Sequence, residues 1–571
     1  MRKPTLQDIF FAAWLVDLTV AAPLQESQSI EDFDWSSITP TEQLEYHQCG
    51  DGYKCARLKV PLDWTNASNS SQSVAIAIVT LPATVPNTDP SFGGTILINP
   101  GGPSGSGTDM AIELGHYLQG VVDGERHYEI LGFDPRGVAF STPRADCYNG
   151  NEIRRTADQV QAAGIPSPDS GSTALNYLYQ SHAAVSELCA EAGDDSIFAH
   201  MSTASVARDM LEIVDRVNEL KHNSSTRANS EEPKLQYLGV SYGTFLGNTF
   251  ASMFPNRVGR MVIDGVEDPH DYIKGTWEKN LNDFEKVLDH FYQTCFEAGS
   301  DCLLKKDSDK NASAIRERID SFLSSLENSP VPTVYEGRTR LVTSLLVRTM
   351  IHDSLYDPIN RYDPLSALLA SSLTGDHTLL LQNSTVELES ACQIKNETYP
   401  ANYTWANDAG SSILCGDSAF DAGDRNITWA RDLVDFLYEQ SPTAGEDWTK
   451  LPLCCIGWKY KPNFVFRGPF GSSMGKNNTS NAPLLVLSTR YDHATPLANA
   501  FAVSKSHAGS TVVVQESWGH TALLTSRSNC TAGIVKEYFA TGKLPQEGTV
   551  CEQDCVPSIP LKPCPGLPGY A

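Results

Sequence analysis

Short apolar runs recur along the chain, and most are bounded by glycine or proline. Runs of this kind predict buried β-strands, here at residues 73–81, 95–98, 128–133, 235–240, 260–263, 483–487 and 511–514. Between some of them the apolar positions follow the period of a helix, as in residues 204–220. Alternating strands and helices predict an α/β fold with a mostly parallel central sheet and helices on both faces.

The strand pattern is interrupted by one long segment. The first five predicted strands lie within roughly 190 residues, whereas the next begins only at residue 483. The intervening stretch is rich in helix-forming residues, and a structureless loop of that length would be unusual in a compact domain. We therefore expect a mainly helical cap domain at 271–450, inserted between the two parts of the core at 23–270 and 451–571.

The N-terminus carries a separate apolar run at residues 9–22, which follows Arg2 and Lys3 and ends in small residues. This order is typical of a secretory signal peptide, predicted here as residues 1–22 with cleavage near Ala22. The run has 14 residues, fewer than the about 20 that a membrane span needs. A disordered or core-packed N-terminus is the alternative, because Asp17 interrupts the run.

The charge balance narrows the classes of partner. The 571 residues include 43 Lys and Arg against 69 Asp and Glu, a formal net charge of −26. A nucleic-acid backbone or an anionic membrane surface would repel such a chain, so we expect neither as a partner. The hydrophobic fraction of 41% is enough to bury a large core and does not fit disorder.

Two residue counts favour an extracellular protein. The 14 cysteines suit disulfides in an oxidising compartment. Cys49 with Cys55 and Cys295 with Cys302 are plausible pairs, but the sequence leaves the connectivity open. Neither C-x-x-C nor H-E-x-x-H occurs, so we expect no metal and no other cofactor. Asn-x-Ser/Thr acceptors number 11, where about four would arise by chance. They are Asn66, Asn69, Asn223, Asn311, Asn383, Asn396, Asn402, Asn426, Asn477, Asn478 and Asn529.

The sharpest chemical signal is Gly-Val-Ser-Tyr-Gly at 239–243, where a predicted strand runs directly into helical sequence. Glycine at both flanks lets the strand reverse into the helix, since larger side chains would clash. Ser241 would then lie at a helix N-terminus, where N–H groups stabilise developing negative charge. A second match, centred on Ser473, lies in a Gly/Asn/Ser-rich stretch that no strand directly precedes, so we interpret Ser473 as a loop residue.

A nucleophilic serine needs a base, and the base needs an acid to orient it. In α/β hydrolases these follow the serine in the order acid, then histidine, after late strands. Asp492 follows the predicted strand 483–487, and His520 follows 511–514, at the edge where a parallel sheet collects its site. His493 is the alternative base, but neighbouring loop residues cannot both point at one serine.

The oxyanion hole should come from backbone N–H groups after an early strand and after the nucleophile. The predicted strand 95–98 leads into the glycine-rich turn Asn-Pro-Gly-Gly-Pro-Ser-Gly at 99–105. No Gly-Lys-Ser/Thr follows, which excludes a P-loop. We therefore assign the donors to the N–H groups of Gly102 and Tyr242.

Several separated blocks of the chain share the motifs of one family. They are residues 101–103, 133–141, 207–209, 237–244, 253–255, 263–265, 413–417, 455–458, 492–496 and 542–551. Together they resemble the tripeptidyl aminopeptidase-like branch of the proline iminopeptidase family of α/β-hydrolase serine peptidases. The resemblance extends over about residues 45–555 and is weakest in the insertion. The chain departs from the family pattern at Asn99, where many relatives carry histidine, and at Ala139, where glycine is usual.

The resemblance implies an α/β-hydrolase fold, a Ser241, Asp492 and His520 triad, and release of short peptides or amino acids from free N-termini. It also implies that the insertion caps the site, where carboxylates hold the substrate's ammonium group. Glu267 lies where the chain leaves the core for the cap and is a candidate for that role. In a chain with 69 carboxylates, however, a solvated acidic turn is the favoured interpretation of Glu267.

Three functions remain open from the sequence. The first is a secreted serine aminopeptidase, and the second is an esterase or lactonase that uses the same triad on a small-molecule ester. A shared nucleophile and fold do not separate amide from ester substrates. The third is a non-catalytic binding protein with a hydrolase fold, which would be expected to lack one of the triad residues, whereas Ser241, Asp492 and His520 are all present.

Overall fold

The computed structural model describes residues 30, 33–66, 72–165, 167–168, 170–221, 232–383, 407–420, 422–472 and 483–564. The predicted signal peptide and Ser473 lie outside these residues. Among the helices so described, none combines the length and the apolar character that a membrane span requires.

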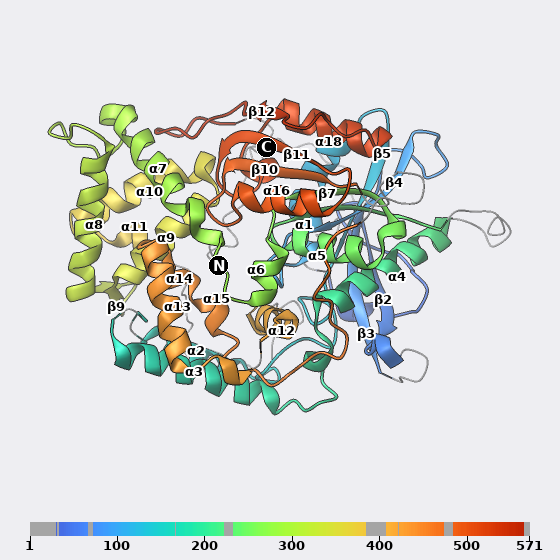
Figure 1. The fold of residues 1–571 in the computed structure, drawn as a ribbon, viewed down its shortest axis with the longest axis horizontal. Coiled ribbons are helices and arrows are strands. Elements are labelled where there is room, and N and C mark those ends of the chain that lie inside the picture. Colours follow the sequence, from blue (N-terminus) through green and yellow to red (C-terminus); the bar gives the residue numbers. More distant parts are fainter. Residues whose placement is uncertain are drawn as a thin grey trace, which may run out of the picture.

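A ten-stranded sheet forms the centre of the protein (Figure 1). Its strands are β1 (His47–Gly50), β2 (Tyr53–Pro61), β3 (Ser73–Leu81), β4 (Phe92–Asn99), β5 (His127–Phe133), β6 (Leu235–Val240), β7 (Val258–Asp264), β10 (Leu485–Tyr491), β11 (Thr511–Trp518) and β12 (Val550–Glu552). The spatial order is β1-β2-β3-β5-β4-β6-β7-β10-β11-β12. The pairs from β1 to β5 are antiparallel, and all later neighbours run parallel, which confirms the mostly parallel sheet.

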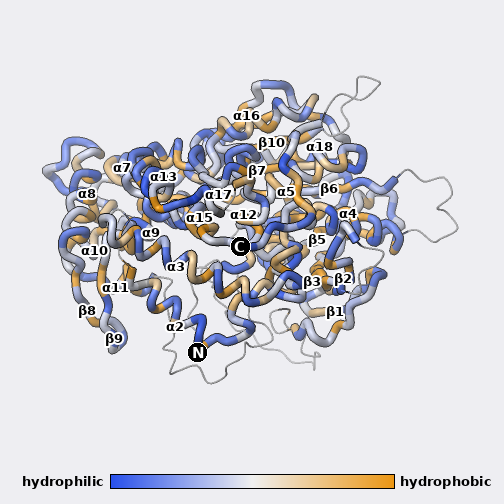
Figure 2. Tube along the Cα trace, turned by 60° about the horizontal axis from the view of Figure 1, so that its bottom comes forward, coloured by the Kyte–Doolittle hydropathy of each residue, from blue (hydrophilic) through white to orange (hydrophobic). Residues whose placement is uncertain are grey.

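Alternate side chains of the strands enter two apolar cores, one on each face of the sheet. In β3, Ile76 and Ile78 join one buried cluster, whereas Ala77 and Val79 join the other. Helices α4 (Thr203–Lys221), α5 (Tyr242–Met253) and α16 (Leu497–Ser506) cover the first face. Helices α1 (Gly107–Val122), α17 (Ala522–Thr525) and α18 (Asn529–Thr541) cover the second. Figure 2 shows hydrophobic segments both around the sheet and within the helical lobe, interleaved with hydrophilic segments.

The segment between β7 and β10 is mainly helical, as the sequence predicts. Its helices are α6 (Pro269–Lys274), α7 (Phe284–Ala298), α8 (Ala312–Asn328), α9 (Ser344–Leu355), α10 (Pro358–Leu373), α11 (Thr378–Gln382), α12 (Asn407–Asp417), α13 (Ile427–Gln440), α14 (Gly445–Trp448) and α15 (Lys450–Leu453). A hairpin of β8 (Val331–Tyr335) and β9 (Arg338–Val342) interrupts them. Most of these helices form a lobe beside the sheet (Figure 1).

Short 3-10 helices supplement these elements at Trp35–Ser37, Trp64–Asn66, Ile197–His200, Pro255–Arg257, Asn280–Asp283, Gly299–Asp301 and Ala422–Asp424.

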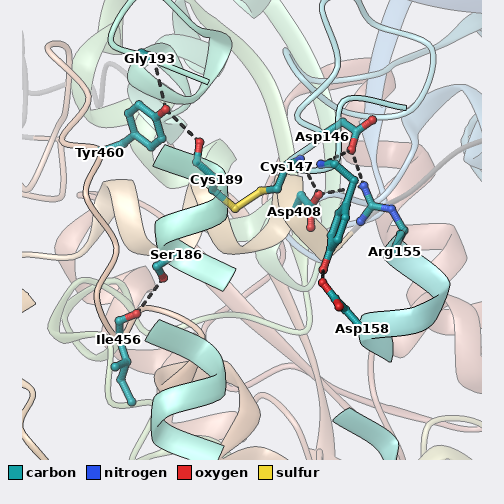
Figure 3. Close-up of a disulfide and its surroundings, with 11 residues drawn as sticks. Asp146, Cys147, Arg155, Asp158, Ser186, Cys189, Gly193, Asp408, Ile456 and Tyr460 are labelled. Carbon is teal, nitrogen blue, oxygen red and sulfur yellow. Dashed lines mark hydrogen bonds and ion pairs between the residues drawn. A yellow bond between two sulfur atoms is a disulfide. The ribbon is translucent and has the colours of Figure 1, made fainter. Parts of the chain in front are cut away.

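A second excursion from the sheet joins this lobe. Helices α2 (Glu152–Ala163) and α3 (Ser172–Ala190) lie between β5 and α4, and α3 packs against α13. The disulfide Cys147–Cys189 closes the excursion, and Ser186 donates a hydrogen bond of 2.7 Å to the carbonyl of Ile456 (Figure 3). Helix α3, which the sequence analysis assigns to the core, therefore packs against the inserted helical segment.

Six disulfides link the described cysteines. Both pairs favoured by the sequence, Cys49–Cys55 and Cys295–Cys302, are among them. The others are Cys147–Cys189, Cys415–Cys455, Cys530–Cys551 and Cys555–Cys564. Cys454 is a free thiol, and Cys392 lies outside the described residues. The even cysteine count therefore reflects many disulfides, as expected for an oxidising compartment.

The described glycosylation acceptors lie at the surface. They are Asn66, Asn311, Asn383, Asn426 and Asn529, all exposed or partly exposed. The other six predicted acceptors, Asn69, Asn223, Asn396, Asn402, Asn477 and Asn478, lie outside the described residues. A surface position is what a glycan requires, and glycosylation itself stays a prediction.

The Asp-Pro-Arg-Gly motif after β5 is a structural clamp. The guanidinium of Arg136 donates bonds of 2.8 and 2.7 Å to the two carboxylate oxygens of Asp209 on α4, and both side chains are fully buried. Arg136 also donates to the carbonyl of Leu62 at 2.7 Å. Asp134 accepts a bond of 2.7 Å from Ser106, which caps α1. The motif thereby holds α4 and the start of α1 against the sheet.

Candidate active site

Ser241 lies in the sharp turn between β6 and α5, with φ 56° and ψ −130°. A non-glycine residue in this conformation is strained by about 1–3 kcal/mol, so the surroundings must hold it. Both flanking positions must be glycine because a larger side chain would clash with the backbone. A Cβ on Gly239 would lie 2.5 Å from the carbonyl oxygen of Gly243, and a Cβ on Gly243 would lie 2.7 Å from the carbonyl oxygen of Asn99. The Ser241 N–H donates to the carbonyl of Asp264 at 3.0 Å.

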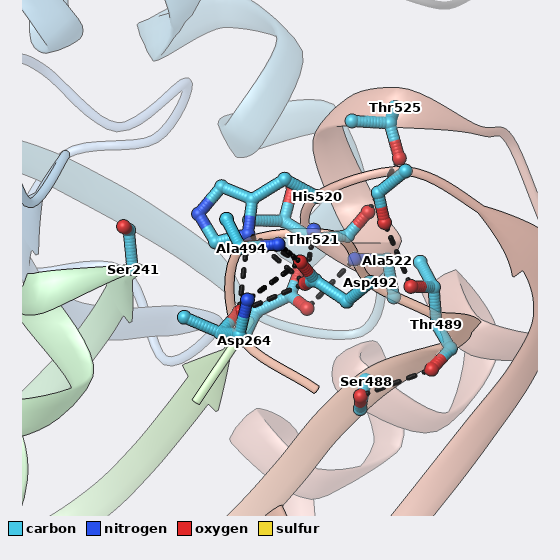
Figure 4. Close-up of polar contacts among 12 residues, drawn as sticks. Ser241, Asp264, Ser488, Thr489, Asp492, Ala494, His520, Thr521, Ala522 and Thr525 are labelled. Carbon is cyan, nitrogen blue, oxygen red and sulfur yellow. Dashed lines mark hydrogen bonds and ion pairs between the residues drawn. The ribbon is translucent and has the colours of Figure 1, made fainter. Parts of the chain in front are cut away.

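Asp492 and His520 meet at the same edge of the sheet, because β10 and β11 are parallel neighbours and both end there. His520 Nδ1 lies 3.0 and 2.9 Å from the two carboxylate oxygens of Asp492. Figure 4 shows the imidazole with one edge toward Asp492 and the opposite edge toward Ser241. His520 Nε2, on the side away from Asp492, has no hydrogen-bond partner among the described residues.

The surroundings of Asp492 favour its ionised form. Its Oδ1 accepts the N–H groups of Ala494 and Thr495 at 2.9 and 2.8 Å, and its Oδ2 accepts the Thr495 hydroxyl at 2.8 Å. Burial opposes ionisation, but the facing His520 and these donors hold the pKa of Asp492 below its ordinary value. Burial likewise lowers the pKa of His520, and the Asp492 charge more than offsets it, so that this pKa is raised. The pair therefore stabilises an imidazolium.

Gly265 lies between the Ser241 turn and the loop that carries His520. It follows Asp264, whose carbonyl holds Ser241, and a Cβ on Gly265 would lie 3.0 Å from His520 Cε1. The carboxylate of Asp264 accepts the N–H groups of Ala522 and Leu523 at 2.7 and 2.8 Å. It thereby anchors the loop that carries His520, while burial raises the pKa of Asp264 to about 6.

The glycine-rich turn after β4 packs directly on the Ser241 turn. Gly101 and Gly102 have φ values of 97° and 113°, which favour glycine. A Cβ on Gly101 would lie 2.8 Å from Ser241 Cβ and 3.0 Å from the Tyr242 nitrogen. The Asn99 side chain supports the turn by accepting the Gly101 N–H at 3.0 Å. The structure thus brings the Gly102 turn and the N-terminus of α5 together beside Ser241.

His493 is a buried neighbour of this group. Neither ring nitrogen has a hydrogen-bond partner among the described residues, and burial lowers its pKa well below the ordinary value. Its ring packs edge-on against Tyr356, with centroids 4.4 Å apart. The hydrogen-bonding partner of Asp492 is therefore His520 and not the alternative, His493.

Glu267 is buried rather than solvated, with 3% of its surface exposed. Its N–H donates to Thr244 at 2.9 Å, and its carboxylate accepts the Asn280 side-chain amide at 3.1 Å. Within the described part of the chain, no cation pairs with it. Burial, reinforced by the charge of Asp271, raises the pKa of Glu267 well above its ordinary value. The prediction of a solvated acidic turn is therefore wrong for this side chain.

Several residues of the site could not be identified from the sequence. Asp264 and Thr495 fall inside blocks that resemble the family, but their contacts with the His520 loop and with Asp492 depend on the tertiary structure. Tyr356, at the end of α9, places its ring edge-on to His520 with centroids 5.5 Å apart. No local sequence pattern around Tyr356 predicts this ring contact, because it joins residues of the insertion and of the core.

Within the part of the chain that the structure describes, no group of metal-ligating side chains lies at Ser241. Among the described residues, the grouping compatible with a metal is Cys415, Cys454 and Cys455. Cys415 and Cys455 are joined in a disulfide, so Cys454 alone retains a thiol there. A disulfide sulfur is not a thiolate ligand, and this group therefore does not suit a zinc ion.

Comparisons with known proteins agree with the fold. A family model described as the alpha/beta hydrolase fold matches residues 94–307, and one described as TAP-like protein matches residues 441–551. The chain is 26% identical over 511 residues to a tripeptidyl aminopeptidase of Streptomyces lividans, covering 88% of this chain and 84% of the relative.

Two mycobacterial relatives show similar identity. The serine protease Hip1 of Mycobacterium tuberculosis is 25% identical over 512 residues, covering 88% of this chain and 87% of that protein. The carboxylesterase B of the same species is 25% identical over 544 residues, covering 93% and 91%. The similarity therefore extends over almost the whole length of each protein.

Proposed function

The chain is an α/β hydrolase of the TAP-like peptidase group, and on that premise we propose that it is a secreted serine aminopeptidase. It would release short peptides or amino acids from free N-termini. The observation that carries the proposal is the buried Asp492–His520 pair. His520 Nε2, which has no hydrogen-bond partner within the described ranges, faces Ser241.

In this proposal Ser241 is the nucleophile. His520 Nε2 takes the proton of the Ser241 hydroxyl as the oxygen attacks the scissile carbonyl carbon, and Asp492 stabilises the resulting imidazolium. The oxyanion of the tetrahedral intermediate accepts bonds from the N–H groups of Gly102 and Tyr242. His520 then protonates the leaving amine. Water, activated by the same imidazole, hydrolyses the acyl-enzyme and restores Ser241.

Glu267 is our candidate for holding the substrate's ammonium group. It is a buried carboxylate with no cationic partner among the described residues, two residues beyond Gly265, which packs against His520. A buried carboxylate is costly unless paired, and an ammonium group brought in by the substrate would supply the partner. The net charge of −26 would also attract cationic peptides to the protein.

The insertion is proposed as the cap over the site. Tyr356, which directly follows α9, contacts the His520 ring, and a Cβ on Gly519 would lie 2.6 Å from Pro358 of α10. These contacts place insertion side chains beside His520. A covered site suits small substrates, because it admits a chain end more readily than the middle of a folded protein.

Secretion and glycosylation form part of the proposal. The six disulfides and the exposed acceptors support an extracellular location, with the N-terminal 22 residues acting as the signal peptide.

Two comparisons test the function. Ser241→Ala should abolish hydrolysis and leave the circular dichroism spectrum unchanged; hydrolysis at the wild-type rate would contradict the assignment.

Tripeptidyl and aminoacyl anilides with free and acetylated N-termini test the aminopeptidase activity. Cleavage should disappear on acetylation, and Glu267→Gln should raise KM for the free substrates. Equal cleavage of acetylated substrates would contradict recognition of the ammonium group.

An esterase is the second candidate, favoured by the similarity to a carboxylesterase. The same Ser241 chemistry would act on a small ester. Turnover of short acyl esters by the wild-type protein, with no cleavage of any free peptide anilide, would establish this candidate in place of the first.

A further inference from the structure

Helix α12 of the insertion contacts the glycine-rich turn of the expected oxyanion hole directly and reaches Tyr242, which supplies the other expected donor, through Thr203. A Cβ on Gly410, near the start of α12, would lie 3.3 Å from the carbonyl oxygen of Pro103 and 3.2 Å from the Ser104 hydroxyl, so this helix packs on the glycine-rich turn. Its last residue, Asp417, accepts hydrogen bonds from Thr203, whose hydroxyl also contacts Tyr242 at the start of α5. Figure 1 shows α12 near α6, where the insertion meets the sheet domain.

The carboxylate of Asp417 ends a chain of hydrogen bonds that begins at Tyr242. Asp417 Oδ2 accepts the Thr203 hydroxyl at 2.5 Å and the Tyr272 hydroxyl at 3.2 Å. Because the Thr203 hydroxyl donates to Asp417, it can only accept from the Tyr242 hydroxyl, 2.5 Å away. Asp417 Oδ1 also accepts the Thr203 N–H at 2.9 Å. The side chain of Tyr242 is therefore held at its far end by a carboxylate of the insertion.

Every residue in this series of hydrogen bonds is buried. Asp417 is 2% exposed and Tyr242 is 3% exposed. The Tyr242 and Tyr272 rings lie 5.7 Å apart, and Phe245 packs against Tyr272 at 4.0 Å. Burial raises the pKa of Asp417 to about 6, so above that pH the carboxylate is ionised and accepts stronger bonds than a neutral group. Little freedom remains for Tyr242 while these bonds persist.

The backbone N–H of the same Tyr242 is the donor assigned to the oxyanion. It follows Ser241, whose strained φ of 56° persists only while the surroundings fix the turn. We propose that Asp417 is a positioning residue for the oxyanion hole, acting on Tyr242 through Thr203 and Tyr272. The insertion thus helps to build the catalytic site as well as cover it.

This inference rests on the proposed serine-hydrolase chemistry and is tested by variants that keep side-chain shape. Asp417→Asn replaces the charged acceptor, and Tyr242→Phe removes only the hydroxyl. Complete removal of an oxyanion donor costs about 10²- to 10³-fold in kcat, so displacement of one should cost less. We expect kcat to fall about 10- to 100-fold in Asp417→Asn and about 5- to 10-fold in Tyr242→Phe, with KM within about twofold.

A tetrahedral analogue separates positioning from a merely structural effect. A peptide aldehyde with a free N-terminus forms an oxyanion on Ser241, whereas the corresponding alcohol does not. In Asp417→Asn the aldehyde should bind more weakly by the same factor as kcat falls, while the alcohol binds as before. The double variant Asp417→Asn/Tyr242→Phe should be no slower than Asp417→Asn, because both changes break one chain of bonds.

Asp408→Asn is the matched control. Asp408 is also a buried carboxylate of α12, but it accepts the Cys147 N–H at 2.9 Å and an Arg155 N–H at 3.0 Å, away from Tyr242 (Figure 3). Its kcat per folded molecule should stay within about twofold of wild type. An equal loss of kcat in both helix variants, multiplicative losses in the double variant, or unchanged aldehyde affinity in Asp417→Asn would overturn the proposal.

The labelling rate of Ser241 by a fluorophosphonate keeps this test separate from the substrate assignment. If the wild type cleaves esters and not peptides, the aminopeptidase function fails, but labelling should still slow in Asp417→Asn. If Asp417→Asn does not fold, Tyr242→Phe decides: labelling at the wild-type rate would overturn the proposal.

Discussion

Replacing Asp492 with asparagine should almost abolish catalysis while preserving the fold. The substitution is nearly isosteric, but it exchanges one acceptor oxygen for an NH₂ group. Asp492 Oδ1 accepts two backbone N–H groups, from Ala494 and Thr495. The carbonyl oxygen of asparagine will therefore occupy that position, and the NH₂ group will take the place of Oδ2, which lies 2.9 Å from His520 Nδ1.

The orientation of this NH₂ group determines the size of the effect. Since it donates a hydrogen bond, it favours the tautomer in which Nδ1 of His520 is unprotonated and Nε2 carries the proton. Nε2 can then no longer take the proton of Ser241. The change also removes the charge that raises the pKa of His520. The wrong tautomer in such a triad costs about 10⁴-fold in kcat, equivalent to about 5.4 kcal/mol of transition-state stabilisation.

The assay is steady-state hydrolysis of a tripeptidyl anilide at several pH values, with urea unfolding as a check on the folded state. We expect kcat to fall about 10⁴-fold at pH 7, with Asp408→Asn as a control that keeps kcat. A kcat within about tenfold of wild type would refute the role of Asp492 and the tautomer argument with it.

Three further predictions follow from the contacts described above. Gly101→Ala should slow labelling of Ser241 at least about tenfold, because the new Cβ would lie 2.8 Å from the Ser241 Cβ; an unchanged rate would contradict the packing of the turn. Burial raises the pKa of Asp134 from 3.8 to about 7, so its stabilising contribution is present below pH 3.8 and is lost as pH rises through 7. Asp134→Asn, which does not titrate, should therefore lose less unfolding free energy in urea between pH 5 and 8 than wild type, and equal losses would refute this. In a secretory host, Asn311→Asp should remove one glycan by mass yet retain the N-cap bond to Ala314, so that stability stays within about 0.5 kcal/mol; an unchanged mass would refute glycosylation there.

The sequence predicts the core of this fold well because strand and helix periodicity are local signals. All seven predicted strands occur, with ends that differ by a few residues, and the helical segment 204–220 corresponds to α4. The sequence pattern does not predict the sheet strands β1, β2 and β12, nor the hairpin of β8 and β9. Residues of β2 such as Lys54, Arg57 and Lys59 mix charge into the strand, which weakens its apolar pattern.

In the candidate site, too, residues with a local sequence signal could be predicted, whereas residues that depend on tertiary contacts could not. Ser241 could be assigned from its glycine-flanked turn, and Asp492 and His520 from their order after two late strands. The hydrogen bonds that link Asp417 to Tyr242 could not, because Thr203 on α4 and Asp417 on α12 are 214 positions apart in the sequence. Glu267 is the opposite case: its place in the sequence marks it as a candidate, but its burial depends on tertiary packing around Asn280, which no local pattern reports.

The most direct test of the central claim is to identify the residue that becomes acylated or phosphonylated. The wild-type protein is incubated with a fluorophosphonate and digested, and the modified peptide is sequenced by mass spectrometry. We predict a single adduct on Ser241, absent from Ser241→Ala and slowed in Asp492→Asn. An adduct on another serine, or equal labelling of the Ser241→Ala variant, would contradict the assignment of this serine as the nucleophile.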